Sequence, residues 1–286
     1  MTARSLRAVL PAPRPHWVGD GFLVSPLFGD LAFSEAISPF LMLDWAPEHH
    51  FPPAPAARGV GPHPHRGFET VTIVHAGEVV HRDSAGHGGR IGPGDVQWMT
   101  AGGGLEHEEM HADALHRDGG PVSMAQLWVN LPSRSKRVPP RYQPILATEI
   151  PVIDAPDHRL RLVAGDFADR RGPAATHTPL TVIDGHLAAG AALAPTFPDG
   201  WTVLIAVLDG EVSVAGRSVT GPAVAVLDRR GDTVPLAAHG DAHVLLLAGE
   251  PIDEPIAHMG PFVMNTREEL IEAVADWRAG RMGRLD

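Results

Sequence analysis

Two histidines separated by a single proline form a short segment of the chain, His63-Pro64-His65. Alternate residues of an extended strand point to the same face, so both imidazoles would face one side. Pro64 fixes its own φ and disfavours helical geometry at His63. A pair at this spacing also occurs by chance, but its geometry is that of two metal ligands presented together.

A second pair with the same spacing lies further along the chain, at His107 and Glu109. Placed beside His63 and His65, it would complete a set of three neutral nitrogen ligands and one anionic oxygen ligand. Such a set suits a divalent first-row transition metal. Octahedral geometry would leave two positions free, enough for a substrate oxygen and for dioxygen. These four residues are therefore the predicted metal ligands.

The composition limits the kinds of protein that this chain can be. Its 286 residues are enough for two domains, each with its own core. The 31 glycines and 28 prolines favour many short strands and turns over long helices. The formal net charge of -11 argues against direct binding to nucleic acid. The chain has no cysteine, which excludes disulfides, thiolate nucleophiles and cysteine-bound zinc.

The N-terminal segment contains no apolar run of the length that a signal peptide requires. No run elsewhere in the sequence is long enough to span a membrane. We therefore expect a cytoplasmic protein that does not associate with membranes.

The first half of the chain alternates short apolar or β-branched runs with turn residues. Even spacing without a helical period predicts a β-sandwich or a small barrel. A linker between domains, with basic residues on a solvated face, is predicted at Pro132–Pro140. The predicted strands include residues 22–24, 31–33, 40–43, 70–74, 79–82, 95–99 and 126–131.

An internal repeat relates the two halves of the chain. Residues 70–79 resemble residues 202–212, with one residue inserted, and both segments end at a Gly-Glu-Val turn. A second, similar β unit is the natural inference. The positions equivalent to the histidine pair fall near Thr196 and Pro198, where the sequence has no His-x-His. One metal site is therefore expected, in the first half.

The chain ends in a predicted helix. Thr266 and Glu269 have the spacing of a capping box, and Gly280 would end the helix. The apolar stripe of this helix is expected to pack on a sheet, with binding to a partner as the alternative. The stripe consists of Leu270, Ile271, Val274 and Trp277.

Four separate blocks of the sequence resemble the pirin family. They read HPHRGFET at residues 63–70, GPGDVQWMTAG at 92–102, LWVNL at 127–131 and GPFVMNT at 260–266. The resemblance runs from about Gly19 to the C-terminal helix. Pirins belong to the cupin superfamily, so it implies an all-β chain of two cupin-type β-barrel (jelly-roll) domains with a C-terminal helix. Residues 1–134 would form the domain with the metal site, and residues 135–286 a domain without metal.

The resemblance also implies a function. Several pirins open the ring of flavonols such as quercetin, and others act as regulators through protein partners. We therefore predict a quercetin 2,3-dioxygenase-like oxidoreductase that acts on a small aromatic enol and dioxygen, with Glu109 as the catalytic base. The alternative is a non-catalytic regulatory protein that responds to its metal or redox state through a protein partner. The ligands implied by the family are His63, His65, His107 and Glu109, and the ion is Fe(II), with Ni, Cu, Mn or Zn as alternatives.

Some neighbouring residues leave alternatives open. In other cupins the carboxylate ligand comes four residues after the second histidine, which here is Glu69, whereas the pirin pattern favours Glu109. His111 shares the parity of His107 and could compete with it as a ligand. Glu106 and Glu108 should face away from the metal and pair with cations or water. Surface or turn positions are expected for His49, His50, His75, His81, His87 and His116, and core positions for Trp98, Met99 and Trp128.

Overall fold

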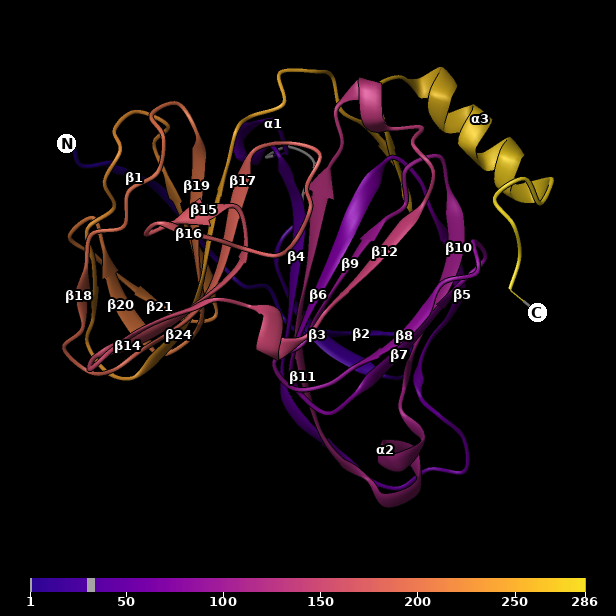
Figure 1. Cartoon of the computed structure of the whole chain (residues 1–286), viewed down its shortest axis with the longest axis horizontal. Helices are drawn as coiled ribbons and strands as arrows, with labels where there is room; N and C mark the ends of the chain where they lie inside the picture. Colours follow the sequence, from indigo (N-terminus) through magenta and orange to yellow (C-terminus); the bar gives the residue numbers. More distant parts are fainter. Residues whose placement is uncertain (1, 30–33, 286) are drawn as a thin grey trace. The chain divides into compact units, whose positions relative to one another are not determined.

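The computed structural model describes residues 2–29 and 34–285, and most of its regular structure is β-strand (Figure 1). Three α-helices are present in the described part: α1 (Ser34–Ile37), α2 (Asp113–Asp118) and α3 (Arg267–Arg278). None of these described helices is long and apolar enough to cross a membrane. The strand predicted at residues 31–33 lies outside the described residues, and the cytoplasmic location stays a prediction.

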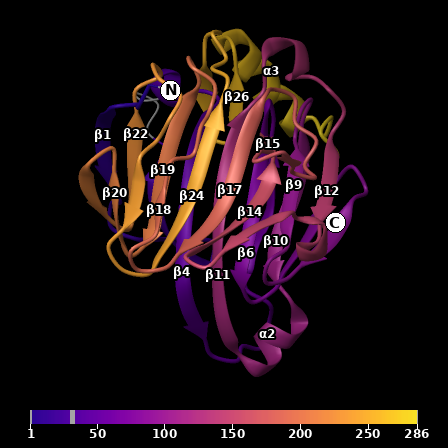
Figure 2. The ribbon, with the colours of Figure 1, turned by 60° about the vertical axis from the view of Figure 1, so that its left-hand side comes forward.

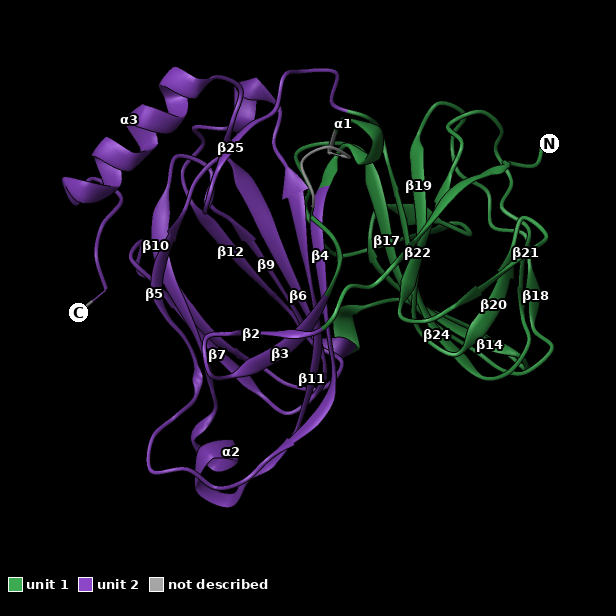
Figure 3. Ribbon diagram, turned by 180° about the vertical axis from the view of Figure 1, so that it is seen from behind, with its two compact units in different colours: residues 1–14, 26–40, 148–251 green, residues 15–25, 41–147, 252–286 purple. Residues whose placement is uncertain are grey.

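The chain forms two compact units whose segments interleave along the sequence (Figure 3). Unit 1 contains residues 1–14, 26–40 and 148–251, and unit 2 contains residues 15–25, 41–147 and 252–286. The sequence predicts a single boundary between residues 134 and 135, whereas in the structure residues 1–14 and 26–40 belong with 148–251, and residues 252–286 belong with 41–147. Strand β1 (Leu6–Pro11) pairs with β22 (Ala223–Leu227) of unit 1, while helix α3 belongs to unit 2.

The segment predicted as a solvated linker, Pro132–Pro140, lies within unit 2. Lys136 is buried there, and its ammonium group donates hydrogen bonds to Gly67 O at 2.8 Å, Asn130 Oδ1 at 2.8 Å and Val263 O at 2.9 Å. The prediction of a solvated face is therefore wrong at this residue. A buried cation needs such partners, and they join three segments of the unit.

Unit 2 contains a jelly-roll of two antiparallel sheets. The larger sheet has the strand order β12-β9-β6-β11-β4-β3-β2, and the smaller has the order β5-β10-β7-β8. Apolar side chains such as Phe22, Val74 and Met124 form a core cluster in this unit. The strand bounds are β2 (His16–Val18), β3 (Phe22–Phe28), β4 (Phe40–Phe51), β5 (Gly59–His65), β6 (Phe68–Ala76), β7 (Val79–Asp83), β8 (Gly88–Ile91), β9 (Val96–Thr100), β10 (Leu105–His111), β11 (Gly120–Asn130) and β12 (Arg141–Ile145).

Unit 1 repeats this arrangement (Figure 2). Its larger sheet has the order β1-β22-β19-β24-β17-β14-β13, and its smaller sheet the order β18-β23-β20-β21. Buried Val, Leu and Ile side chains pack together in a single core cluster. The remaining strand bounds in this unit are β13 (Val152–Ala155), β14 (His158–Ala164), β15 (Asp166–Phe167), β16 (Arg170–Arg171), β17 (Leu180–Leu187), β18 (Ala192–Leu193), β19 (Thr202–Asp209), β20 (Glu211–Val214), β21 (Arg217–Thr220), β23 (Leu236–Ala238) and β24 (Ala242–Gly249).

The predicted repeat is confirmed by the two sheets. Strand β6 lies third in its sheet between β9 and β11, and β19 lies third in the other sheet between β22 and β24. The fold is therefore the predicted pair of cupin-type barrels with a C-terminal helix.

Helix α3 follows the short hairpin of β25 (Ala257–Met259) and β26 (Phe262–Met264). Its predicted capping box is present: Thr266 Oγ1 accepts from Glu269 N at 3.2 Å, and Glu269 Oε2 accepts from Thr266 N at 3.1 Å. The predicted apolar stripe is only partly correct. Leu270 is buried, but Ile271 is 57% exposed, because one residue turns the helix by about 100° away from the packed face.

Candidate metal centre

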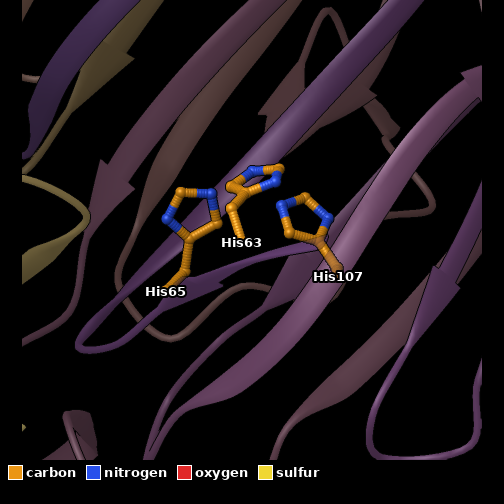
Figure 4. Close-up of side chains that lie close together, drawn as sticks. All are labelled: His63, His65 and His107. Atoms are coloured by element: carbon orange, nitrogen blue, oxygen red, sulfur yellow. The ribbon is translucent and has the colours of Figure 1, made fainter. Parts of the chain in front are cut away.

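Three of the predicted ligands come together on two neighbouring strands of unit 2. His63 and His65 lie on β5 and His107 lies on β10, which pairs with β5 so that His107 stands opposite His63. One ring nitrogen from each histidine lies within 4.8 Å of the other two. Figure 4 shows the three rings gathered in one place. The alternation of strand side chains therefore brings the histidines together as predicted.

Main-chain carbonyl groups orient two of these rings. His63 Nδ1 lies 2.8 Å from Gly61 O, and His65 Nδ1 lies 3.4 Å from Pro261 O. A neutral imidazole that donates from Nδ1 keeps a lone pair on Nε2. Each of these histidines can therefore offer Nε2 to a metal.

The third ring, His107, is buried. Its Nδ1 lies 3.4 Å from His81 Nδ1, and its Nε2 is buried with no hydrogen-bond partner among the described residues. A buried polar atom without a partner is costly unless something satisfies it. A metal ion bound by the three imidazoles would do so, and the donor set therefore fits a divalent transition metal.

The electrostatics keep two of these rings, His65 and His107, neutral. Burial, followed by the nearby charge of His63, lowers the pKa of His65 to about 3. Burial, followed by the neighbouring histidines His65, His63 and His81, lowers the pKa of His107 well below its usual value. The neutral form is the one that ligates a metal, so the cluster is ready to bind at neutral pH.

The predicted carboxylate, Glu109, is buried on β10 beside this cluster. Its Oε1 accepts hydrogen bonds from Gln97 Nε2 and from Thr72 Oγ1 at 3.2 Å, and its Oε2 accepts one from Gln126 Nε2 at 2.9 Å. Among the described residues, the group within 4.8 Å comprises the three histidines without Glu109. Glu109 nevertheless lines the same pocket as His63 and His65, and its role as fourth ligand stays a prediction.

The two alternative ligands have other partners. Glu69 is buried on β6, where its Oε1 accepts a hydrogen bond from Thr100 Oγ1 at 2.7 Å. His111 Nε2 lies 2.9 Å from Gly21 O, and its ring packs edge-on against Phe22. Neither residue belongs to the described group of three histidines.

The acidic residues that flank His107 face outward, as predicted. Glu108 forms an ion pair with Arg82 at 2.6 Å. Glu106 accepts hydrogen bonds from Trp277 Nε1 and from Leu285 N, each at 3.0 Å. The charge of Glu108 is therefore paired with a cation, and the carboxylate of Glu106 is hydrogen-bonded, both away from the cluster.

A pocket of about 260 Å³ opens beside the histidines. Its walls are mostly apolar, with a few polar groups among them, which is the usual character of a site for a small molecule. Trp98 and Met99 are buried, whereas Trp128 lines this pocket. The lining comprises Val18, Phe22, Val24, Met42, Asp44, Val60, His63, His65, Glu109, Met124, Gln126 and Trp128.

Comparison with known proteins places this architecture in a family. Residues 21–129 match the family described as Pirin, and residues 182–283 match the Pirin C-terminal cupin domain. The chain belongs to the pirin family. A Pseudomonas aeruginosa protein that carries the provisional name quercetin 2,3-dioxygenase is 53% identical to this pirin over 268 residues, covering 93% of this chain and 94% of the relative. The pirin of Rattus norvegicus is 39% identical over 232 residues, covering 79% and 78% of the two chains.

A solved structure agrees with these relationships. The crystal structure of a quercetin 2,3-dioxygenase from Acinetobacter baumannii superimposes on this pirin with a TM-score of 0.97 at 46% identity, and covers 99% of this chain and 100% of that one. The predicted family and the predicted pair of cupin domains are confirmed.

Sequence reasoning missed the residues that surround the proposed ligands. His81 is predicted at the surface or in a turn, and this is wrong, because it lies fully buried on β7 beside His107. The spacing His81-Arg82-Asp83 repeats the alternation of the ligand pairs and could have indicated an inward-facing pair. Gln97 and Gln126 offered no such signal, since they lie on β9 and β11 of the larger sheet and their role depends on that sheet facing Glu109 on β10.

Proposed function

We propose that this pirin is a metal-dependent dioxygenase of the quercetin 2,3-dioxygenase type that acts on flavonol-type enols. The proposal rests on one observation: three imidazoles come together beside an apolar pocket, and two of them, His63 and His65, line it with the buried carboxylate of Glu109. The similarity to proteins named quercetin 2,3-dioxygenase supports the same reaction class.

The proposed metal ligands are His63, His65, His107 and Glu109. Fe(II) is the proposed ion, and Ni, Cu, Mn and Zn are alternatives because imidazole and carboxylate groups accept most divalent ions. A divalent ion bound there supplies Lewis acidity, which lowers the pKa of an enol hydroxyl that binds to it.

Glu109 is the proposed base for the enol proton. Its Oε2 accepts one hydrogen bond, from Gln126, while Oε1 accepts two, so Oε2 has the more available lone pair. The apolar side chains of the pocket would exclude water from the reactive enolate. In the net reaction both atoms of dioxygen enter the organic product, two ring C–C bonds break, and the carbon that bears the enol oxygen leaves as carbon monoxide. No other oxidant is needed.

Oxygen uptake after metal reconstitution tests this function. Metal-free protein would be loaded without air with iron, nickel, copper, manganese or zinc, and then given quercetin and oxygen. We expect one oxygen consumed and one carbon monoxide released per quercetin with at least one metal. Glu109→Gln should lower kcat/KM by roughly 100-fold or more, whereas Glu108→Gln, which faces outward to Arg82, should change it little. Absence of uptake with all five metals would reject catalysis.

One observation favours the regulatory alternative. Helix α3 contacts the residue that follows His65 and the residue that precedes His107: Arg66 Nη2 pairs with Asp276 at 2.7 Å, and Trp277 donates to Glu106. A change at the ligand-bearing strands would therefore reach a helix on which Ile271 is exposed. Capture of a protein partner that differs between the ferrous and ferric forms, in a protein without turnover, would favour this role over catalysis.

A further inference from the structure

A chain of side-chain contacts leads from His107 toward the surface of unit 2. His107 Nδ1 lies 3.4 Å from His81 Nδ1, and His81 Nε2 lies 3.3 Å from Asp83 Oδ2. The same Asp83 oxygen lies 3.1 Å from His87 Nδ1. The side chains of His81 and Asp83 are fully buried, whereas that of His87 is 37% exposed. Buried polar groups in such a row need a defined set of donors and acceptors.

This row of side chains results from the alternation of residues on β7 and from the pairing of β7 with β10. Strand β7 pairs with β10 so that His107 stands opposite Asp83, and Glu109 stands opposite His81. His81 and Asp83 are alternate residues and turn inward, whereas Arg82 between them turns outward to the ion pair with Glu108. The row is therefore a consequence of strand alternation and register.

The turn after β7 holds the carboxylate of Asp83 in place. Its Oδ1 accepts hydrogen bonds from Ala85 N at 2.9 Å and from His87 N at 3.0 Å. Burial acts to raise the pKa of this carboxyl, but hydrogen bonds from His81 and His87 outweigh burial and lower it. Asp83 is therefore a fixed, ionised acceptor.

An ionised carboxylate at this position determines where the hydrogens lie. Asp83 can only accept, so His81 must carry its hydrogen on Nε2, and a neutral His81 then has a lone pair on Nδ1. When that lone pair accepts across the 3.4 Å contact, His107 donates from Nδ1, which leaves the lone pair of Nε2 for a metal. The row thus specifies the tautomer of His107 that a ligand at Nε2 requires.

Further side-chain contacts connect His81 with Glu109, the other proposed ligand on β10. Tyr142 stacks on the His81 ring, with ring centroids 4.6 Å apart and planes inclined by 16°, and its hydroxyl donates to Gln97 Oε1 at 3.3 Å. Gln97 in turn donates to Glu109. His81 therefore packs within a layer of side chains that supports both His107 and Glu109.

We propose that His81 and Asp83 are positioning residues that hold His107 as the Nδ1–H tautomer and aim its Nε2 at the metal. This inference rests on the proposed metal centre. His107 differs from His63 and His65 because its Nδ1 partner is a side chain, whereas theirs are the carbonyls of Gly61 and Pro261. Of the three histidines, His107 is therefore the one whose orienting partner can be removed by substituting a side chain.

Binding of Co(II) to the metal-free protein, followed by chelator competition and by the visible spectrum of the bound ion, tests the proposal. His81→Leu removes the acceptor, and Asp83→Asn presents an amide N–H to His81 and so favours the wrong tautomer. Each should weaken Co(II) binding by roughly 10- to 100-fold and alter the spectrum. His81→Asn keeps an acceptor oxygen at the position of Nδ1 and should restore binding close to that of the wild type. Arg82→Gln, the outward-facing residue of the same strand, is the matched control.

The outcomes separate this inference from the proposed function. A wild-type protein that binds no Co(II) would overturn the metal centre and this inference with it. A wild type that binds Co(II), with His81→Leu and Asp83→Asn binding equally well, would overturn the positioning role alone. Equal loss in His81→Leu and His81→Asn would show that the acceptor is not what matters, and would also overturn it.

A measurement on the wild type covers the case in which a variant does not fold. In the ¹⁵N NMR spectrum of the Zn(II)-loaded protein, His81 should carry its hydrogen on Nε2 and His107 on Nδ1. A hydrogen on Nδ1 of His81 would overturn the proposal without any substitution.

Discussion

Glu69 offers a test of how burial acts near the proposed centre. It lies four residues after His65, where other cupins carry a carboxylate ligand, but here it is buried and accepts a hydrogen bond from Thr100. Burial raises its pKa from 4.5 to about 7, against the opposing effect of that hydrogen bond. Glu69→Gln keeps the size of the side chain and the acceptor for Thr100, and removes the ionisable group.

Proton linkage gives the sign and size of the pH-dependent change that Glu69 makes to the free energy of unfolding. Below pH 4.5 Glu69 is protonated in both the folded and the unfolded state, so its ionisation costs no stability. Between pH 4.5 and 7 the unfolded state loses the proton first, so stability falls as pH rises, and the loss is complete above pH 7. At about 1.4 kcal/mol per pKa unit, the penalty is below about 1 kcal/mol at pH 5 and about 3 kcal/mol at pH 8.

Urea unfolding of the metal-free protein at pH 5, 6, 7 and 8 measures this penalty. The stability of Glu69→Gln relative to the wild type should increase by roughly 2 kcal/mol from pH 5 to pH 8. Glu108→Gln, which changes an outward-facing carboxylate, should show no such rise. A difference between Glu69→Gln and wild type that does not vary with pH would refute the reasoning. Loss of Co(II) binding in Glu69→Gln would make Glu69 a ligand and would refute the assignment to Glu109.

Two further predictions concern helix α3. Asp276→Asn leaves the buried Arg66 without its carboxylate and should destabilise the protein by roughly 3 kcal/mol in urea unfolding, whereas Asp118→Asn, which breaks an exposed pair with Arg117, should change stability little. Equal losses of stability in Asp276→Asn and Asp118→Asn would contradict the expectation that a buried ion pair is costlier to break than an exposed one. Thr266→Ala removes the helix cap and should cost about 1 kcal/mol, while Thr266→Ser should keep most of it, and an alanine variant as stable as wild type would show that the cap contributes nothing.

The pairing of His63 with His65, and of His107 with Glu109, could be predicted because a strand has a side-chain period of two. The repeat of β6 by β19 and the capping box of α3 could be predicted because each depends on residues close together in the sequence. The fold and the histidine cluster could therefore be predicted from local side-chain patterns and from the long sequence blocks that resemble the pirin family.

The interleaved units could not be predicted in the same way. Strand β1 pairs with β22, a strand that comes more than two hundred positions later in the sequence, and Lys136 is buried by segments that meet only in the folded unit. Nothing in the composition around Pro132–Pro140 distinguishes a buried lysine from a solvated one, because two of the three acceptors, Gly67 O and Val263 O, come from distant parts of the chain.

By itself, the sequence of this pirin determined which side chains share a strand face, and with them the three histidines that can ligate a metal. Only the tertiary structure decided that β7 lies beside β10, and hence that His81 and Asp83 stand behind His107. The physical reason is that alternation acts within one strand, whereas the partners of a buried nitrogen or carboxylate are set by strand register between distant segments.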